Sequence, residues 1–487
     1  MRNSLTAFIV FCLLLACGAA VDAQIYDTLW TRSYFNGYWD TANCIQETPD
    51  HGFIMVGATW AEGESESDLN LIKTDSMGVV EWTTILGDSA VNEGGNHVLL
   101  TDDGGYLVSG QTEKWVFSGG LWVVKFNAAG DTVWTWPPDS TDYNGFCHHA
   151  VQTEDGGYAI TGTNNISGYT FQAFLLRLDA DGNLEWMHHY GDLSYQEGWF
   201  ITEMPDSGFI VAGMDNTGFA TLDDWWAFRT DKNGIMQWDS TYYMSDSYDE
   251  VRHACKVDDG IVLVGRVYAM GHVMKIDFDG QRVWSKSISK IQANESNRSI
   301  CATPDGGFVV GGWLGVAGHN RDYHLIKLDE VGDTMWTYTV GGGDNDHGRY
   351  AIPTSDSGYA FIGMSTSFVN GSAMYLARIG EVPLDVPGDG TVGLPRDFEL
   401  LQNYPNPFNP ATTICFQTPV RAPVEVSVYD ILGRRVVKLA DRVMSAGRHT
   451  VQWDGDNATG TPVATGVYFY RVTVGDRVQS RSMLLLK

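Results

Sequence analysis

A tryptophan recurs along most of this chain at nearly constant spacing. It occupies Trp30, Trp82, Trp134, Trp186, Trp238, Trp284 and Trp336. Except for one shorter step after Trp238, the interval is about 52 residues. A period of roughly 50 residues is typical of propeller blades. Because one large apolar ring per copy needs burial in every copy, the chain is expected to fold as an array of repeats.

A pair of glycines recurs in phase with the tryptophans. In the third copy Gly157 precedes the apolar run YAIT and Gly162 closes it. Short runs that are rich in β-branched and aromatic residues and bounded by turn residues indicate strands. The other pairs are Gly52/Gly57, Gly105/Gly110, Gly208/Gly213, Gly260/Gly265, Gly307/Gly312 and Gly358/Gly363.

Each repeat also contains a second strand and a hairpin. In the third copy FLLRLD is followed by a turn at Gly182, where a positive φ suits glycine, and then by the strand that carries Trp186. We therefore predict an all-β chain with a seven-bladed β-propeller over residues 24–381. The seventh copy lacks a tryptophan strand, and YDTLW at the start of the mature chain supplies one, so Trp30 is expected to close the last blade.

The two ends of the chain carry other signals. Residues 1–23 have a basic start, an apolar run and small residues at Val21 and Ala23, which predicts a secretory signal peptide cut after Ala23. A lipoprotein site at Cys17 is the alternative. No later apolar stretch is long enough to span a bilayer. Residues 382–397 are rich in Pro, Gly and Asp and are expected to be a linker, which includes an incomplete calcium-loop pattern from Asp385.

The last segment, residues 398–487, predicts a small Ig-like β-sandwich from alternating strands such as VEVSVYD and VYFYRV. The series NYPNPFNPATTI, VYDILGRRV, HTVQWDG and GVYFYRV closely resembles the type A C-terminal sorting domain of type IX secretion substrates. The resemblance implies that an outer-membrane secretion machinery of the Bacteroidetes and their relatives is a partner, and that the protein is released or attached at the cell surface. An ordinary adhesion-type sandwich is the alternative.

The hairpin D-x-x-G-x-x-x-W, seen at Asp179–Trp186, resembles the tryptophan-docking hairpin of quinoprotein-type propellers. The whole repeat resembles uncharacterised seven-bladed surface propellers of bacteria and archaea, a resemblance that implies a fold and no reaction. Quinoprotein dehydrogenases typically have eight blades and many have an adjacent cysteine pair, and the sialidase turn has a shorter spacing than the turns of this chain. We therefore expect no cofactor and assign no catalytic residue.

Charge, cysteine spacing and histidine placement argue against nucleic-acid or membrane partners and against a metal site. The chain has a net charge of −29, and the acidic excess precedes residue 398, so nucleic acid and anionic membranes are not expected as partners. Cys44, Cys147, Cys255, Cys301 and Cys415 follow no metal-binding spacing and are expected to be inert thiols, with a disulfide or a reactive thiol as the alternative. The adjacent histidines at 148–149 and 188–189 point to opposite faces of a strand, so no metal site is predicted.

The strongest local signal lies at the start of the innermost strand of each blade, which faces the channel or its mouth. Three successive blades offer Arg252, Arg298 and Arg349 there, and histidines occur at His97, His149, His253 and His347. Guanidinium groups at this spacing suit a carboxylate or another anion. The structural alternative is that Glu295 pairs with Arg298 and Asp346 pairs with Arg349, which would join neighbouring blades.

Two functions follow from these features. The first is an exported propeller that binds an extracellular glycan, peptide or protein at the channel mouth. The second is a secreted hydrolase or lyase that acts on glycans or peptides at the same place.

Overall fold

The computed structural model describes residues 25–382 and 398–485, apart from short gaps. The gaps are residues 37, 89–90, 116–117, 138–142, 167–170, 193–194, 217–222, 246–248, 269, 289–294, 316–320, 368–370, 401–402, 404–411, 445–446 and 476. The expected signal peptide with Cys17, nearly all of the linker and most of NYPNPFNPATTI lie outside the described residues. All elements in the described part are β-strands, and they belong to two compact units, Tyr26–Val382 and Pro383–Lys487.

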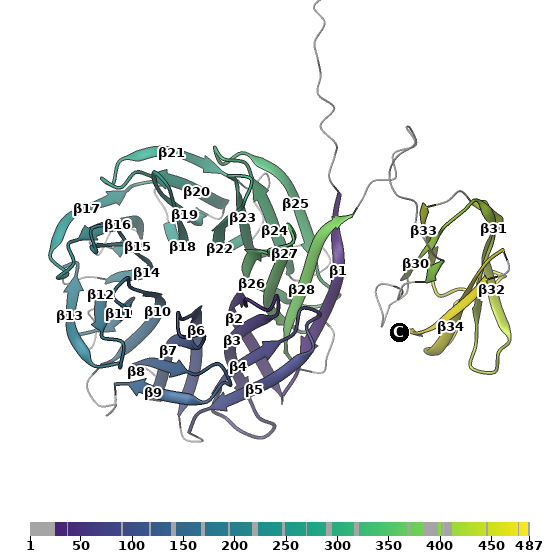
Figure 1. Cartoon of the computed structure of the whole chain (residues 1–487), viewed down its shortest axis with the longest axis horizontal. Coiled ribbons are helices and arrows are strands. Elements are labelled where there is room, and N and C mark those ends of the chain that lie inside the picture. Colours follow the sequence, from purple (N-terminus) through teal and green to yellow (C-terminus); the bar gives the residue numbers. More distant parts are fainter. Residues whose placement is uncertain are drawn as a thin grey trace, which may run out of the picture. The chain divides into compact units, whose positions relative to one another are not determined.

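In the first unit the strands lie around a ring, and we call each run of four antiparallel strands a blade (Figure 1). Five of the sheets have four strands each, and β10 to β17 form one sheet of eight, because the pair Phe171–Tyr195 joins two blades. Blade 1 contains β2 (Trp39–Glu47), β3 (Phe53–Trp60), β4 (Asp68–Thr74) and β5 (Val80–Leu86). Blade 2 contains β6 (Asn92–Leu100), β7 (Tyr106–Trp115), β8 (Ser118–Phe126) and β9 (Thr132–Trp136). Blade 3 contains β10 (Gly145–Gln152), β11 (Tyr158–Asn165), β12 (Phe171–Leu178) and β13 (Leu184–Tyr190). Blade 4 contains β14 (Tyr195–Glu203), β15 (Phe209–Asn216), β16 (Asp224–Thr230) and β17 (Met236–Tyr242).

The remaining blades follow the same order. Blade 5 contains β18 (Asp249–Val257), β19 (Gly260–Val267), β20 (Met270–Ile276) and β21 (Arg282–Ser287). Blade 6 contains β22 (Glu295–Ala302), β23 (Phe308–Leu314), β24 (Asp322–Leu328) and β25 (Thr334–Val340). Blade 7 contains β26 (Asp346–Pro353), β27 (Tyr359–Ser365), β28 (Ala373–Val382) and, as its outer strand, β1 (Ile25–Tyr34). The start of the described chain thus pairs with the end of the propeller, and the first strand of every blade lies on the inside of the ring (Figure 1).

The recurring tryptophan joins each blade to the next. Gly182 in the hairpin of blade 3 has a φ of 82°, and an ideal Cβ there would lie 2.6 Å from the ring of Trp134 in blade 2. The hairpin therefore needs glycine both for its left-handed backbone and for the space that the neighbouring indole fills. The indole also packs against the next blade, on the strand that follows the first glycine of that blade's pair. Trp134, for example, packs against Tyr158, which follows Gly157, with 5.8 Å between ring centroids. The repeated tryptophans are half-buried rather than fully buried.

An ion pair between a largely buried Lys or Arg and an exposed Asp recurs in every blade, and the sequence patterns did not predict it. In blade 1 the Lys73 Nζ lies 2.8 Å from Asp50 and 2.8 Å from Glu81, and it also donates to the carbonyl oxygen of Thr74 at 2.9 Å. Burial raises the pKa of Asp50, but hydrogen bonds from Lys73, Thr48 and the backbone outweigh it and lower that pKa to about 2. The equivalent pairs are Lys125–Asp103, Arg177–Asp155, Arg229–Asp206, Lys275–Asp259, Lys327–Asp305 and Arg378–Asp356.

The second unit is a sandwich of two antiparallel sheets. One sheet contains β29 (Glu399–Leu400), β30 (Thr412–Thr418) and β33 (Gly447–Trp453). The other contains β32 (Arg435–Met444), β31 (Ala422–Tyr429), β34 (Gly466–Val474) and β35 (Arg477–Leu485). The inward side chains of both sheets, among them Trp453 and Tyr470, form one buried core of their own. This arrangement is the Ig-like sandwich that the sequence predicted.

Candidate functional site

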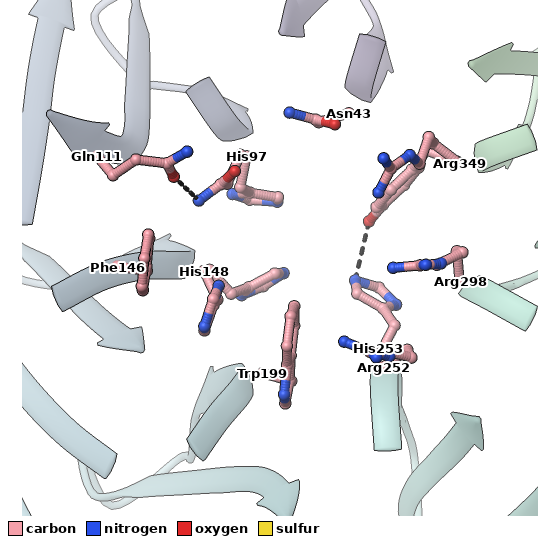
Figure 2. A pocket seen from close by; sticks show the side chains of 13 residues that line it. Asn43, His97, Gln111, Phe146, His148, Trp199, Arg252, His253, Arg298 and Arg349 are labelled. Atoms are coloured by element: carbon pink, nitrogen blue, oxygen red, sulfur yellow. Dashed lines mark hydrogen bonds between the residues drawn. The ribbon is translucent and has the colours of Figure 1, made fainter. Parts of the chain in front are cut away.

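Each innermost strand carries one β-bulge at the same place. The pairing register shifts between Ala42 and Cys44 in blade 1, and the six other inner strands have an equivalent shift. A bulge leaves one residue without a pairing partner and redirects its side chain. These residues are Asn43, Asn96, His148, Trp199, Arg252, Arg298 and Arg349. All seven line one cavity of about 240 Å³ (Figure 2).

The second glycine of each blade makes this bulge possible. An ideal Cβ on Gly363 would lie 2.0 Å from the carbonyl oxygen of His347, and one on Gly57 would lie 1.8 Å from that of Thr41. Since the obstacle is backbone, only glycine fits where the bulged strand crosses its neighbour. The same close approach occurs at Gly110, Gly162, Gly213, Gly265 and Gly312. The second glycine of each pair therefore allows each inner strand to bulge and to direct one side chain into the cavity.

One side of this ring is a continuous stack. The His148 and Trp199 rings are parallel, with centroids 3.9 Å apart, and the Arg252 guanidinium lies 4.8 Å from the Trp199 centroid. The Trp199 indole donates to Glu197 at 2.7 Å, and Arg252 donates to Glu250 through Nε at 3.0 Å and Nη2 at 2.5 Å. Burial and the positive charge of Arg252 lower the pKa of His148 to about 3, so this imidazole is neutral at neutral pH. On this side of the ring, Trp199 and Arg252 therefore each donate to a carboxylate of the protein.

The next two residues of the ring are not satisfied in this way. Within the described part of the chain, Arg298 and Arg349 form no ion pair, and the buried Nε of Arg298 has no hydrogen-bond partner. Burial and the neighbouring charges of Arg349 and Arg252 lower the pKa of Arg298. Burial and the charge of Arg252 likewise lower the pKa of Arg349. Both guanidinium groups remain charged, as arginine does in proteins, and Figure 2 shows them side by side at the cavity.

The expected acidic partner of Arg349 is engaged elsewhere, so that pairing prediction is wrong. Asp346 accepts hydrogen bonds from the Ser365 and Ser367 hydroxyls and from the backbone NH of Gly342. The side chain of Glu295, the expected partner of Arg298, lies outside the described residues.

Two amides complete the ring beyond Arg349. Asn43 Nδ2 donates to the carbonyl oxygen of Gly95 at 2.8 Å, and Asn96 Nδ2 donates to that of Cys147 at 3.0 Å and to Gln111 at 2.6 Å. Because a backbone carbonyl can only accept, these bonds fix the orientation of both amides. Their Oδ1 atoms accept no hydrogen bond from the described residues. Neither oxygen is among the buried polar atoms that lack a partner.

Three histidines and a tyrosine close the floor of this cavity, and we call His97, His149, His253 and Tyr350 the channel waist. All four also line a second cavity of about 610 Å³ on the other side. The His97 and His149 centroids are 4.0 Å apart, and the Tyr350 hydroxyl lies 3.0 Å from His253 Nε2. Burial lowers the pKa of His97 to about 3, with a further contribution from His253, and burial lowers the pKa of His253 to about 4. The waist is therefore uncharged at neutral pH.

Six of the seven residues predicted for the site line the cavity. They are Arg252, Arg298, Arg349, His97, His149 and His253. The seventh, His347, does not line it; its Nε2 lies 3.0 Å from Arg321 Nη1 and its ring lies 5.8 Å from that of Trp313. Sequence reasoning missed Asn43, Asn96, His148 and Trp199, although they occupy the same place in their blades as the three arginines.

The structure also locates the residues considered for other chemistry. Cys44, Cys147, Cys255 and Cys301 are free thiols. Among the described residues, no group of three or more His, Cys, Asp or Glu side chains is arranged to hold a metal ion. Over the same residues, no helix has the length and hydrophobicity needed to cross a bilayer.

Comparison with known proteins assigns a family model to the end of the chain. Residues 411–477 match the model of the FlgD Ig-like domain, so the C-terminal region contains an Ig-like domain of that type. A search of curated proteins gave no match.

Several solved structures are similar to the chain at low identity. PorZ, described as an essential surface component of the type IX secretion system of Porphyromonas gingivalis, is 12% identical with a TM-score of 0.41. The match covers 91% of this chain and 59% of PorZ, so the chain spans less than two thirds of that protein. The WD40 domain of Neurospora crassa Pan2 is 9% identical with a TM-score of 0.47, over 74% of this chain and 96% of that domain. The propeller of the Pyrococcus furiosus Trilobed protease is 7% identical with a TM-score of 0.41, over 70% and 94%.

Proposed function

We propose that this protein is an exported β-propeller that binds its ligand through an anionic group at the channel mouth. The observation that carries the proposal is that Arg298 and Arg349 face the cavity together without an acidic partner in the described residues. Two neighbouring guanidinium groups that are partly desolvated repel each other, whereas an oxyanion between them would accept several charge-assisted hydrogen bonds. Unfavourable repulsion between like charges is expected at functional sites, where the ligand supplies the missing opposite charge.

The lining of the cavity supports binding rather than turnover. No Asp or Glu is among the described residues that line it, whereas most glycosidases use a pair of carboxylates. Burial raises the pKa of the Tyr350 phenol and lowers that of the His253 imidazole. A general acid or base works best with a pKa near the operating pH, and both shifts lead away from it.

The binding proposal is tested by isothermal titration of the full chain with acetate, sulfate, phosphate and glucuronate. At least one of these anions is expected to bind with one-to-one stoichiometry, more weakly as salt concentration rises. The double variant Arg298→Met/Arg349→Met should bind that anion at least about tenfold more weakly, since charge-assisted hydrogen bonds are worth about 1.5–3 kcal/mol each.

Arg321→Met is the matched control, because it removes one partly buried arginine that does not line the cavity. The control should retain the parent's affinity within about twofold, which corresponds to about 0.4 kcal/mol of binding free energy. Equal binding by the parent and the double variant, or no binding of any anion to the parent, would contradict the proposal.

The route of export is a further part of the proposal. The C-terminal sandwich has its own core, carries an Ig-like domain match, and contains the segments that resemble a type IX sorting domain. The type IX machinery would be its partner, and the cell surface or the medium its destination. Deleting residues 480–487, which removes most of β35, should retain the protein in the periplasm with its propeller folded. Fusing residues 382–487 to an unrelated passenger with a signal peptide should bring that passenger to the surface. A truncated protein that still reaches the surface would refute this role.

A further inference from the structure

The ring of bulge residues presents donors and acceptors in a fixed order. Arg298 and Arg349 offer only donors, and the next two blades offer the Oδ1 atoms of Asn43 and Asn96 as acceptors. Figure 2 shows Asn43 next to Arg349 at the edge of the same cavity. A ligand that fills this space therefore meets cations on one side and amide carbonyl oxygens on the adjacent side.

We infer that the ligand is a hydroxylated carboxylate of the size of one sugar ring, that is, a sugar acid. This inference rests on the proposed anion site and specifies the rest of the molecule. The carboxylate would lie between Arg298 and Arg349, which suit its planar pair of oxygens. Hydroxyl groups beside it would donate to Asn43 Oδ1 and Asn96 Oδ1, whose own NH₂ groups already donate to backbone carbonyls.

The cavity also distinguishes a sugar acid from a neutral sugar. Neutral sugars commonly stack on an exposed aromatic face, but both neighbours of Trp199 in the ring cover it. His148 stacks on it at 3.9 Å between centroids, and Arg252 lies 4.8 Å from its centroid. Phe146 also lines the cavity, so the feature that favours a charged sugar over a neutral one is the arginine pair. The cavity of about 240 Å³ is smaller than the roughly 300–1,000 Å³ of pockets that hold drug-sized ligands, which favours a small ligand such as one sugar residue.

The same environment disfavours an amino acid. An ammonium group would also donate to the Asn43 and Asn96 oxygens, but it would lie close to the positive charges of Arg298 and Arg349. No carboxylate among the described lining residues would stabilise it. A hydroxyl group donates equally well and carries no charge.

The test is a set of titrations of the full chain with glucuronate, glucose, propionate, phosphate and serine. Glucuronate is expected to bind at least about tenfold more tightly than propionate or phosphate, because about two further hydrogen bonds form. Glucose and serine are expected to bind more weakly still. Arg349→Met should weaken glucuronate and propionate by the same factor, whereas Asn43→Ala should weaken glucuronate alone.

The possible failures are distinct. If propionate or phosphate binds as tightly as glucuronate, the sugar-acid inference is overturned and the anion site remains. If serine binds as tightly as glucuronate, the ligand is an amino acid and the inference is also overturned. If Asn43→Ala leaves glucuronate binding unchanged, the amide contacts are wrong. If none of the anions binds, the proposed function itself fails.

Discussion

Replacing the second glycine of blade 7 tests the link between the repeat pattern and the site. In Gly363→Ala the new Cβ would lie 2.0 Å from the carbonyl oxygen of His347 and 2.5 Å from the Tyr323 ring. Separations below 3.0 Å do not occur, so the carbonyl must retreat by about 1 Å and the bulge at Arg349 must flatten. Losing about two ladder hydrogen bonds at about 1 kcal/mol each, with about 1–3 kcal/mol of overpacking, gives a destabilisation of about 3–5 kcal/mol.

The assay is urea denaturation followed by tryptophan fluorescence, with anion titration on the same samples. Gly343→Ala is the matched control, because no heavy atom lies within 4 Å of its ideal Cβ, and it should change the unfolding free energy by less than about 0.5 kcal/mol. Gly363→Ala should also weaken anion binding, since Arg349 loses the bulge that directs it into the cavity. If Gly363→Ala unfolds at the same midpoint as Gly343→Ala, the glycine does not support the bulge and the argument fails.

Three further results are expected. Because the folded-state pKa values of His97 and His253 lie near 3 and 4 and unfolded histidine has a pKa of about 6.5, the unfolded chain binds more protons below pH 6.5. Stability should therefore be fully present above about pH 7 and fall by about 1.4 kcal/mol per histidine per pH unit toward pH 5. His97→Phe, which introduces the side chain that blade 4 carries at Phe200, should make denaturation midpoints less dependent on pH. Deleting residues 24–36 removes β1, leaves the edge of β28 unpaired, and should cause aggregation detectable by light scattering; a soluble, cooperatively unfolding product would contradict the ring closure. Trp284→Ala should destabilise the chain by about 2 kcal/mol in urea denaturation, less than the roughly 3–5 kcal/mol of a fully buried tryptophan, because the ring is half-buried.

The fold was largely predictable because its cause repeats. The tryptophan and the hairpin glycine meet between neighbouring blades, as Trp134 and Gly182 do, so both are required once per blade. The C-terminal strands were also evident from their alternating pattern. The ion pair of Lys73 and Asp50 was not evident, because the two residues are distant in sequence and because some blades have Arg in place of the Lys.

The site was only partly predictable, and the reason is the bulge. His347 was predicted to lie near the three arginines at the channel mouth. His347 contacts Arg321 and does not line the cavity, whereas Arg349, the bulge residue two positions further along the strand, does. The second glycine of each blade was the signal for the bulge, and counting back 13 or 14 residues from it would also have identified Asn43 and the other missed members of the ring.

The most direct test of the anion site is the thermal unfolding midpoint of Arg298→Met/Arg349→Met beside the parent, with and without the anion that binds. If the two arginines are held for a ligand, the variant should unfold at a higher temperature than the parent at low salt without anion, because their mutual repulsion is removed. The anion should raise the midpoint of the parent and leave that of the variant unchanged, since only the state that binds is stabilised. A variant that unfolds at a lower temperature without ligand, and still responds to the anion, would show that the arginines are structural and would contradict the account.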